Sequence, residues 1–135
     1  DNKYMKKNLL VLAFAVLAIF KNNACNAQEA DVFVPIAKYM ETGDSERLSA
    51  WFADNLQLDI LGTVNHCTRN QAKLIMKNFF ANHTPKSFKI VHKSWKSPMT
   101  YAVANLDAGG SRYRVIIYVK SLSARSAIHQ IRIEE

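Results

Sequence analysis

The side chains best suited to chemistry in this sequence are histidine, tyrosine and asparagine residues in its C-terminal half. His92, Tyr101, Asn105 and His129 lie in segments where apolar and polar residues alternate, a pattern typical of β-strands. Histidine titrates near neutral pH, and tyrosine and asparagine side chains form hydrogen bonds, so such a set could orient a ligand. We therefore expect these four residues to line a ligand site on one apolar face of a sheet.

Catalysis is a second hypothesis for the same region. His129 or the carboxylate of Asp59 could act as a general base in a small pocket enzyme, such as an isomerase, dehydratase or hydrolase. Asp59, however, alternates with Leu58 and Ile60 on the side of Gln57, which favours a solvated position. The expected apolar face offers no acid, so no residue is assigned a catalytic role and the sequence favours a domain without enzymatic activity.

The remaining polar groups give little indication of a reactive centre. His66 and Cys67 are adjacent in an expected loop, and adjacent side chains of extended chain point apart, so they do not form a nucleophile and base pair. The four histidines and the cysteines lack the spacing of a zinc site. The sequence also has no phosphate-binding loop or glycine-rich dinucleotide turn. We therefore expect neither a metal ion nor a cofactor.

Residues 1–27 have the order of a cleavable signal peptide. Lys6 and Lys7 precede an unbroken apolar run of twelve residues, 9–20, which is too short for a transmembrane helix. Small side chains occupy the −3 and −1 positions of a cleavage site after Ala27. This order predicts an exported protein, periplasmic or secreted, with four extra residues before the first methionine.

Cleavage at that point leaves a mature chain, 28–135, with the length of a single domain. Lipid attachment at Cys25 is the alternative form of processing, and it would keep the protein on a membrane. Cys67 is the only cysteine of the mature chain, so an intramolecular disulfide is excluded. The mature chain has 14 Lys and Arg against 10 Asp and Glu, and this modest excess, together with export, argues against nucleic acid as a partner.

Hydrophobic periodicity predicts helices followed by strands. Apolar residues recur every three or four positions over 32–40, 48–52 and 72–80, which predicts three helices, with a strand over 55–61 between the second and the third. A period of two then predicts four strands, at 88–96, 99–107, 112–120 and 127–134. Because the connections are short, we expect an antiparallel meander.

The register of the meander decides which side chains face the helices. A two-residue loop over Gly109 and Gly110 would set Val103 opposite Ile116, whereas a three-residue loop with a bulge aligns Val103 with Val115. We prefer the three-residue loop. It collects on one face Phe88, Ile90, His92, Tyr101, Val103, Asn105, Tyr113, Val115, Ile117, His129, Ile131 and Ile133. A tight turn at 97–98 would pair His92 with Val103 and Ile90 with Asn105.

The opposite face of the predicted sheet is more apolar than a solvated face needs, which indicates a partner surface. Its apolar residues are Trp95, Leu106, Ile116, Tyr118 and Ile128. A basic run beside it could contact an anionic glycan or lipid head group, with a solvated strand face as the alternative. The run comprises Lys86, Lys89, Lys93 and Lys96.

Four segments of the mature chain resemble a known bacterial family. They are 31–36 (Asp-Val-Phe-Val-Pro-Ile), 48–54, 70–73 and 105–110. With the order of the elements, they make essentially all of 31–135 similar to the domain of unknown function 4783 family, which looks like a branch of the nuclear-transport-factor-2-like (cystatin-like) superfamily. The resemblance implies an α+β cone of three N-terminal helices packed on a curved antiparallel sheet, often with a pocket inside. It also implies a homodimer that forms through the sheet face.

These observations support three hypotheses, in this order. The first is an exported, non-enzymatic domain that binds an unidentified small molecule or envelope protein. The second is a small pocket enzyme, which a closed pocket lined by His92 and His129 would favour. The third is a protein-interaction module acting through its sheet face, which a filled interior beneath an apolar outer sheet would favour.

Overall fold

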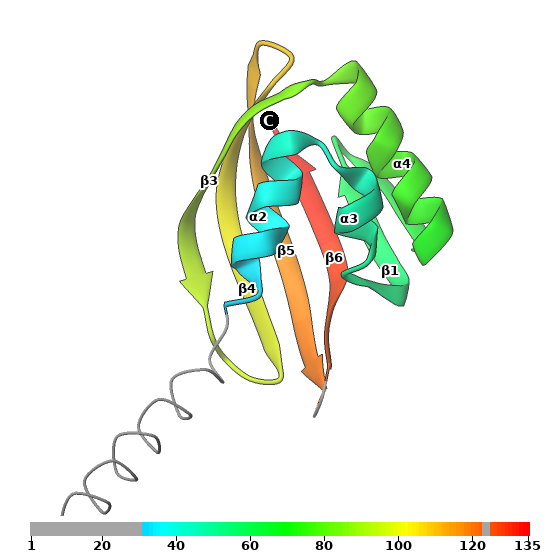
Figure 1. Cartoon of the computed structure of the whole chain (residues 1–135), viewed down its shortest axis with the longest axis vertical. Coiled ribbons are helices and arrows are strands. Elements are labelled where there is room, and N and C mark those ends of the chain that lie inside the picture. Colours follow the sequence, from blue (N-terminus) through cyan, green and yellow to red (C-terminus); the bar gives the residue numbers. More distant parts are fainter. Residues whose placement is uncertain (1–30, 123–124) are drawn as a thin grey trace, which may run out of the picture. The chain divides into compact units, whose positions relative to one another are not determined.

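Three helices and six strands make up the described residues, 31–122 and 125–135, of this computed structural model (Figure 1). In chain order they are α2 (Phe33–Thr42), α3 (Ser45–Ser49), β1 (Phe52–Ile60), β2 (Thr63–Thr68), α4 (Arg69–Asn82), β3 (Pro85–Ser94), β4 (Met99–Ala108), β5 (Ser111–Leu122) and β6 (Arg125–Glu134). The predicted leader, 1–27, lies outside these residues. Across the described ranges, no helix is both long and apolar enough to cross a membrane.

Local capping groups fix where the helices start and stop. Helix α2 ends at Gly43, whose φ of 67° is the left-handed conformation that glycine adopts most easily. The Asp44 side chain then accepts a hydrogen bond from the Arg47 amide at 3.0 Å and starts α3. Helix α4 starts with a capping box, in which the side chains of Thr68 and Gln71 each accept a hydrogen bond from the other residue's amide.

All six strands form one curved sheet in the order β2-β1-β6-β5-β4-β3 (Figure 1). The predicted antiparallel meander is confirmed for β3 to β6. A wholly antiparallel sheet is wrong, however, because β1 lies beside β6 and runs parallel to it. That pair joins segments far apart in the chain, and no local pattern reports such a pairing.

The segment Thr63–Thr68 is a strand, although we expected His66 and Cys67 to lie in a loop. Leu61 and Gly62 both have positive φ, 52° and 86°, and turn the chain back on itself. Strand β2 then pairs antiparallel with β1, with His66 opposite Gln57. Along β2, His66 is exposed and Cys67 is buried, so the two side chains point apart as predicted.

The turn between β4 and β5 has two residues, and the predicted three-residue loop is wrong. Gly109 and Gly110 have φ values of 57° and 83°, and two successive positive values are what a type I′ hairpin turn requires. Strand β4 continues to Ala108, which pairs with Ser111, and Val103 therefore lies opposite Ile116. A one-residue slip in register moves every side chain of a strand to the other face.

The face of β4 that packs against the helices therefore carries mostly small residues. Its fully buried side chains are Ala102, Ala104, Leu106 and Ala108, whereas we expected Tyr101, Val103 and Asn105 there. On β3, His92 pairs with Val103 as predicted. Ile90 pairs with Ala104 and not with Asn105, because the register shifts between Ile90 and His92.

The helices and the sheet enclose one continuous hydrophobic core. It contains Phe33, Ile36 and Met40 of α2, Leu48 of α3, Met76, Phe79 and Phe80 of α4, and inward residues of all six strands. Phe79 and Ile131 belong to this same cluster, so the helices cover one face of the sheet as the periodicity predicts. These side chains lie buried between the helices and the sheet. Burying each large apolar side chain contributes roughly 1.5–3 kcal/mol.

Candidate functional site

The candidate site lies on the outer face of the sheet, opposite the helices. Strand register brings five side chains together there, which we call the aromatic patch: His92, Tyr101, Val103, Ile116 and Tyr118. The Tyr101 ring lies 5.8 Å from that of Tyr118 and 5.9 Å from that of His92, measured between centroids. Such contacts between tilted rings hold aromatic side chains in a defined arrangement.

The aromatic patch is partly open to solvent although it is apolar. Val103 at its centre is 8% exposed, because its neighbours on β3 and β5 cover it. The two tyrosines and Ile116 are half-buried, and His92 is exposed. A half-buried cluster of rings around a covered aliphatic side chain is the arrangement that the centre of a protein interface presents.

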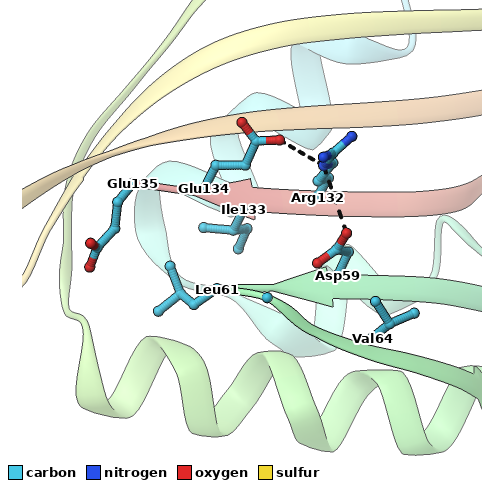
Figure 2. Close-up of a pocket in the computed structure, with 8 residues that line it drawn as sticks. Asp59, Leu61, Val64, Arg132, Ile133, Glu134 and Glu135 are labelled. Carbon is cyan, nitrogen blue, oxygen red and sulfur yellow. Dashed lines mark ion pairs between the residues drawn. The ribbon is translucent and has the colours of Figure 1, made fainter.

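A charged cluster of Arg132, Asp59 and Glu134 lies beside the patch in the strand ladders. Figure 2 shows these three side chains. Arg132 is the ladder partner of Ile116 on one side and of Asp59 on the other. Its Nε lies 2.6 Å from Glu134 Oε1 and 3.7 Å from Asp59 Oδ2. The arginine is thus held between two carboxylates, which fixes its position at the edge of the aromatic patch.

An open groove of about 480 Å³ continues from this cluster to the β1–β2 turn. Figure 2 shows Arg132 and Glu134 on its β6 side, with Leu61 and Val64 across from them. Leu61 and Val64 are 41% and 49% exposed, so both add aliphatic surface to the groove. The outer face therefore carries aromatic, aliphatic and charged side chains. The groove between them is open to solvent.

The structure separates the four residues that we expected to share a ligand site. His92, Tyr101 and Asn105 do share a face, but it is the outer one, because the β4–β5 register differs from the predicted one. His129 lies two strands away from β4, on β6, and lines two other hollows. The inward position of His92, Tyr101 and Asn105 is therefore wrong, while a role of the four residues in binding stays a prediction.

Only some of the residues predicted for the outer face lie there, and their role as a partner surface stays a prediction. Ile116 and Tyr118 lie on the outer face, whereas Leu106 and Ile128 are fully buried in the core. Trp95 leaves the sheet and packs edge-on against Phe33 of α2, with 5.7 Å between centroids. The positions of Leu106 and Ile128 follow from strand register. The register of β4 differs from the predicted one by one residue and turns the Leu106 side chain inward, and the register shift between Tyr118 and Val119 turns the Ile128 side chain inward.

Sequence reasoning did not identify Arg132, Glu134, Leu61 and Val64 as surface features of the site. Alternation with Ile131 and Ile133 already places Arg132 and Glu134 on the outer face, so part of that signal was present. Their proximity to Asp59 depends on the parallel β1–β6 pair, which only the tertiary structure supplies. Asp59 does lie on the side of Gln57, as predicted.

Two titratable groups elsewhere have altered acidity. The Arg112 side chain, and then the Ser87 hydroxyl, donate hydrogen bonds to Asp107 and lower the pKa of its carboxyl group. Burial raises the pKa of the Cys67 thiol, which donates to the Leu56 carbonyl oxygen at 3.6 Å. Asp107 thus stabilises the end of β4 next to the turn, and Cys67 is a core residue with little thiolate character.

The basic run lies along an edge of the sheet. Strand β3 is an outermost strand, and Lys86 and Lys89 are exposed on it, where charged side chains hinder pairing with another chain's strand. Lys93 Nζ lies 5.9 Å from the centre of the Trp95 ring. Within the described ranges, no three His, Cys, Asp or Glu side chains are close enough to hold a metal ion.

Comparison with known proteins identifies the family. The family model for the domain of unknown function DUF4783 matches residues 33–134. The chain is similar to the crystal structure of a DUF4783 family protein from Bacteroides uniformis, with 25% identity and a TM-score of 0.74 over 78% of this chain and 97% of that one. No curated protein matches the chain.

More distant structures share the fold alone. One is an NTF2-like protein from Cytophaga hutchinsonii, with 7% identity and a TM-score of 0.58 over 76% of this chain and 85% of that one. Another is a cystatin-like domain from Nostoc punctiforme, with 9% identity and a TM-score of 0.60 over 76% of this chain and 71% of that one. The chain belongs to the DUF4783 family, and its curved six-stranded sheet with helices on one face has the NTF2-like fold.

Proposed function

We propose that this protein is an exported, non-enzymatic binding module that holds a protein partner on the outer face of its sheet. One observation carries the proposal: the side chains between the helices and the sheet form one buried hydrophobic cluster, while the aromatic patch on the opposite face is partly exposed. Removing this apolar surface from water by binding a partner is favourable in free energy.

The surroundings of the aromatic patch favour a second copy of the chain as that partner. Arg114 and Arg132 lie beside the patch together with Asp59 and Glu134, so both signs of charge border one apolar centre. In a two-fold interface the same surface meets itself, and a border that carries both signs can pair with its own copy. A single-sign border would instead repel that copy.

The pocket-enzyme hypothesis has less support from this geometry. His92 lies in the aromatic patch, whereas His129 lines hollows around β1 and β6, so the two histidines do not share a cavity. The Asp59 carboxylate faces Arg132 on the outer sheet, and no described hollow brings it together with either histidine.

Self-association of residues 28–135, which include the whole compact unit, tests the partner. We expect sedimentation equilibrium to show a concentration-dependent dimer. Tyr118→Glu should lower the association constant at least about tenfold, because it places a charge in the apolar centre. Leu74→Glu is the matched control, since it removes a 57% exposed apolar side chain from α4. A protein that stays monomeric at all concentrations, or equal effects of both variants, contradicts the proposal.

Export is tested separately by the mass of the protein isolated from its own cells. We expect an N-terminus at Gln28 in the periplasmic or secreted fraction, as the order of the first 27 residues predicts. Full-length protein in the cytoplasm would contradict export. A lipid mass on Cys25 would overturn the predicted cleavage site and assign the protein to a membrane.

A further inference from the structure

His129 occupies an irregular position in the sheet. In the ladder with β5, Tyr118 pairs with Gln130 and Val119 with Ile128, so His129 has no partner. In the ladder with β1, the paired residues of β6 are likewise Ile128 and then Gln130, and His129 is passed over. Both neighbouring strands therefore skip this residue. Such bulges redirect a side chain out of the regular pleat and are frequent next to binding sites.

The bulge opens a hollow between β1 and β6. Phe52 of β1 pairs with Ile128 of β6, and the next pair joins Gln57 to Gln130. Between these pairs, residues 53–56 of β1 and the single residue His129 of β6 are not paired with each other's strand. The hollow has a volume of about 390 Å³, within the range of small-molecule sites. Its lining consists of Ala53, Asp54, Asn55, Arg69, Lys120, Arg125, Ala127 and His129, and we call it the basic hollow.

Positive charge exceeds negative charge in the basic hollow. Arg69 is fixed by the Phe52 carbonyl oxygen at 3.1 Å and by Asp54 Oδ1 at 2.9 Å, and Asp54 is the only acidic residue in the lining. Lys120 and Arg125 form no ion pair with any acidic residue in the described ranges. Unneutralised cations around a concavity concentrate positive potential there and attract an anion.

Small and neutral side chains complete the site. Ala53 and Ala127 are the apolar members of the lining, and larger residues would fill the space. A second hollow of about 380 Å³ shares Asn55 and His129 with the first. It adds hydrogen-bonding groups from Gln57, His66, Thr68 and Gln71. A ligand that spans both would have an anionic end and a polar, hydroxylated end.

We propose that the basic hollow binds a polyhydroxylated small molecule that carries an oxyanion, either a carboxylate or a phosphate. Lys120, Arg125 and Arg69 would hold the oxyanion through charge-assisted hydrogen bonds, and His129 and Asn55 would orient the remainder. None of the eight lining residues belongs to the aromatic patch, so substitutions in the two sites can be made separately.

The test is titration of the isotope-labelled protein followed by NMR, with four probes: inorganic phosphate, glucose 6-phosphate, glucuronate and glucose. We expect saturable shifts at the amides of Asn55 and His129 with glucose 6-phosphate or glucuronate, and weaker effects with phosphate or glucose. The better of the two anionic sugars identifies the oxyanion. Glucose binding as tightly as both of them, or no saturable shift with any probe, overturns the proposal.

Three variants separate a built site from general attraction to a basic protein. Lys120→Gln and Arg125→Gln should each weaken binding of the better sugar by about tenfold, the usual effect of losing a charge-assisted hydrogen bond. Lys86→Gln removes the same charge from the exposed edge of β3 and should leave affinity unchanged. An equal loss with Lys86→Gln would overturn the site.

A fourth variant tests the space and not the charge. Ala127→Leu should abolish binding while every cation stays in place, because the larger side chain fills the basic hollow. Full affinity in a folded Ala127→Leu protein would also overturn the proposal. Dispersion of the amide spectrum reports the fold of each variant, and the glutamine variants test the site even if Ala127→Leu does not fold.

Discussion

Val103 on β4 lies directly opposite Ile116 on β5, on the face of the sheet away from the helices. The same ladder sets Ala104 opposite Val115, and both of these side chains are buried under the helices. The register thus divides β4 into an inner side of small residues and Leu106, and an outer side with Tyr101 and Val103. The aromatic patch exists because of this division.

Replacement of single residues on the two sides of β4 measures the division. Leu106→Ala should lower the free energy of unfolding by about 2–5 kcal/mol, because Leu106 is fully buried in the core. Asn105→Ala should change it by less than about 1 kcal/mol, since its half-buried side chain lies on the outer face. Urea denaturation of both variants checks this, and the reverse order would contradict the register.

The two turn glycines should differ in their tolerance of a side chain. Both have positive φ, so Gly110→Ala should cost about 1 kcal/mol through backbone strain. Gly109→Ala should cost more, because its Cβ would lie 3.3 Å from the His83 Cα atom, whereas nothing lies within 4 Å at Gly110. Thermal unfolding of the two variants provides the measurement. Equal melting temperatures would mean that the contact with His83 is not close.

Loss of the α4 capping box should destabilise the domain measurably. Thr68→Ala removes the acceptor of the Gln71 amide and should lower the free energy of unfolding by about 1 kcal/mol. Asn78→Ala, at an exposed position inside the same helix, is the control and should be neutral or slightly stabilising, since alanine has the higher helix propensity. Equal stability of Thr68→Ala and the parent protein would contradict a capping role.

Stability should fall in acid through Asp107. Arg112 and Ser87 hold the pKa of its carboxyl group below the unfolded value, so ionised Asp107 favours the folded state. This contribution is present above the unfolded pKa, near 4, and is lost as pH falls through the folded pKa. Urea denaturation at pH 7 and pH 3 should show a smaller difference for Asp107→Asn than for the parent protein. An unchanged pH dependence would exclude Asp107 as a source.

The Cys67 thiol should react slowly in the folded protein. It is 7% exposed, and burial raises its pKa, so little thiolate is accessible near pH 8. Alkylation by iodoacetamide, followed by mass spectrometry, should be at least about a hundredfold slower in the folded protein than in urea. Similar rates in both conditions would place Cys67 outside the core.

Several features of the fold could be predicted from the sequence because they depend on neighbouring residues. The apolar period over Val32–Met40, the glycine at position 43 and the capping box at Thr68 predict α2 and α4, and both are confirmed. Alternation also predicts the four C-terminal strands. The pairing of His92 with Val103 is confirmed as well.

The candidate site was harder to predict, because it depends on register and on distant strands. The sequence grouped His92, Tyr101 and Asn105 on one face correctly but assigned that face to the wrong side of the sheet. It also added His129, which the double bulge in β6 places elsewhere. The first error comes from a β4–β5 turn that is one residue shorter than predicted. The second comes from the unpaired position of His129 in β6.

The sequence by itself determined α2, α4, the four C-terminal strands and the family, since hydrophobic period, capping groups and short matching segments act over short distances along the chain. Only the tertiary structure decided which side of β4 is buried, that β1 runs parallel to β6, and that Arg132 lies between Asp59 and Glu134. The physical reason is that the alternating residues of β4 give its two faces similar polarity, so the sequence of the strand does not decide which face is buried. The choice between them depends on how the whole sheet packs against the helices.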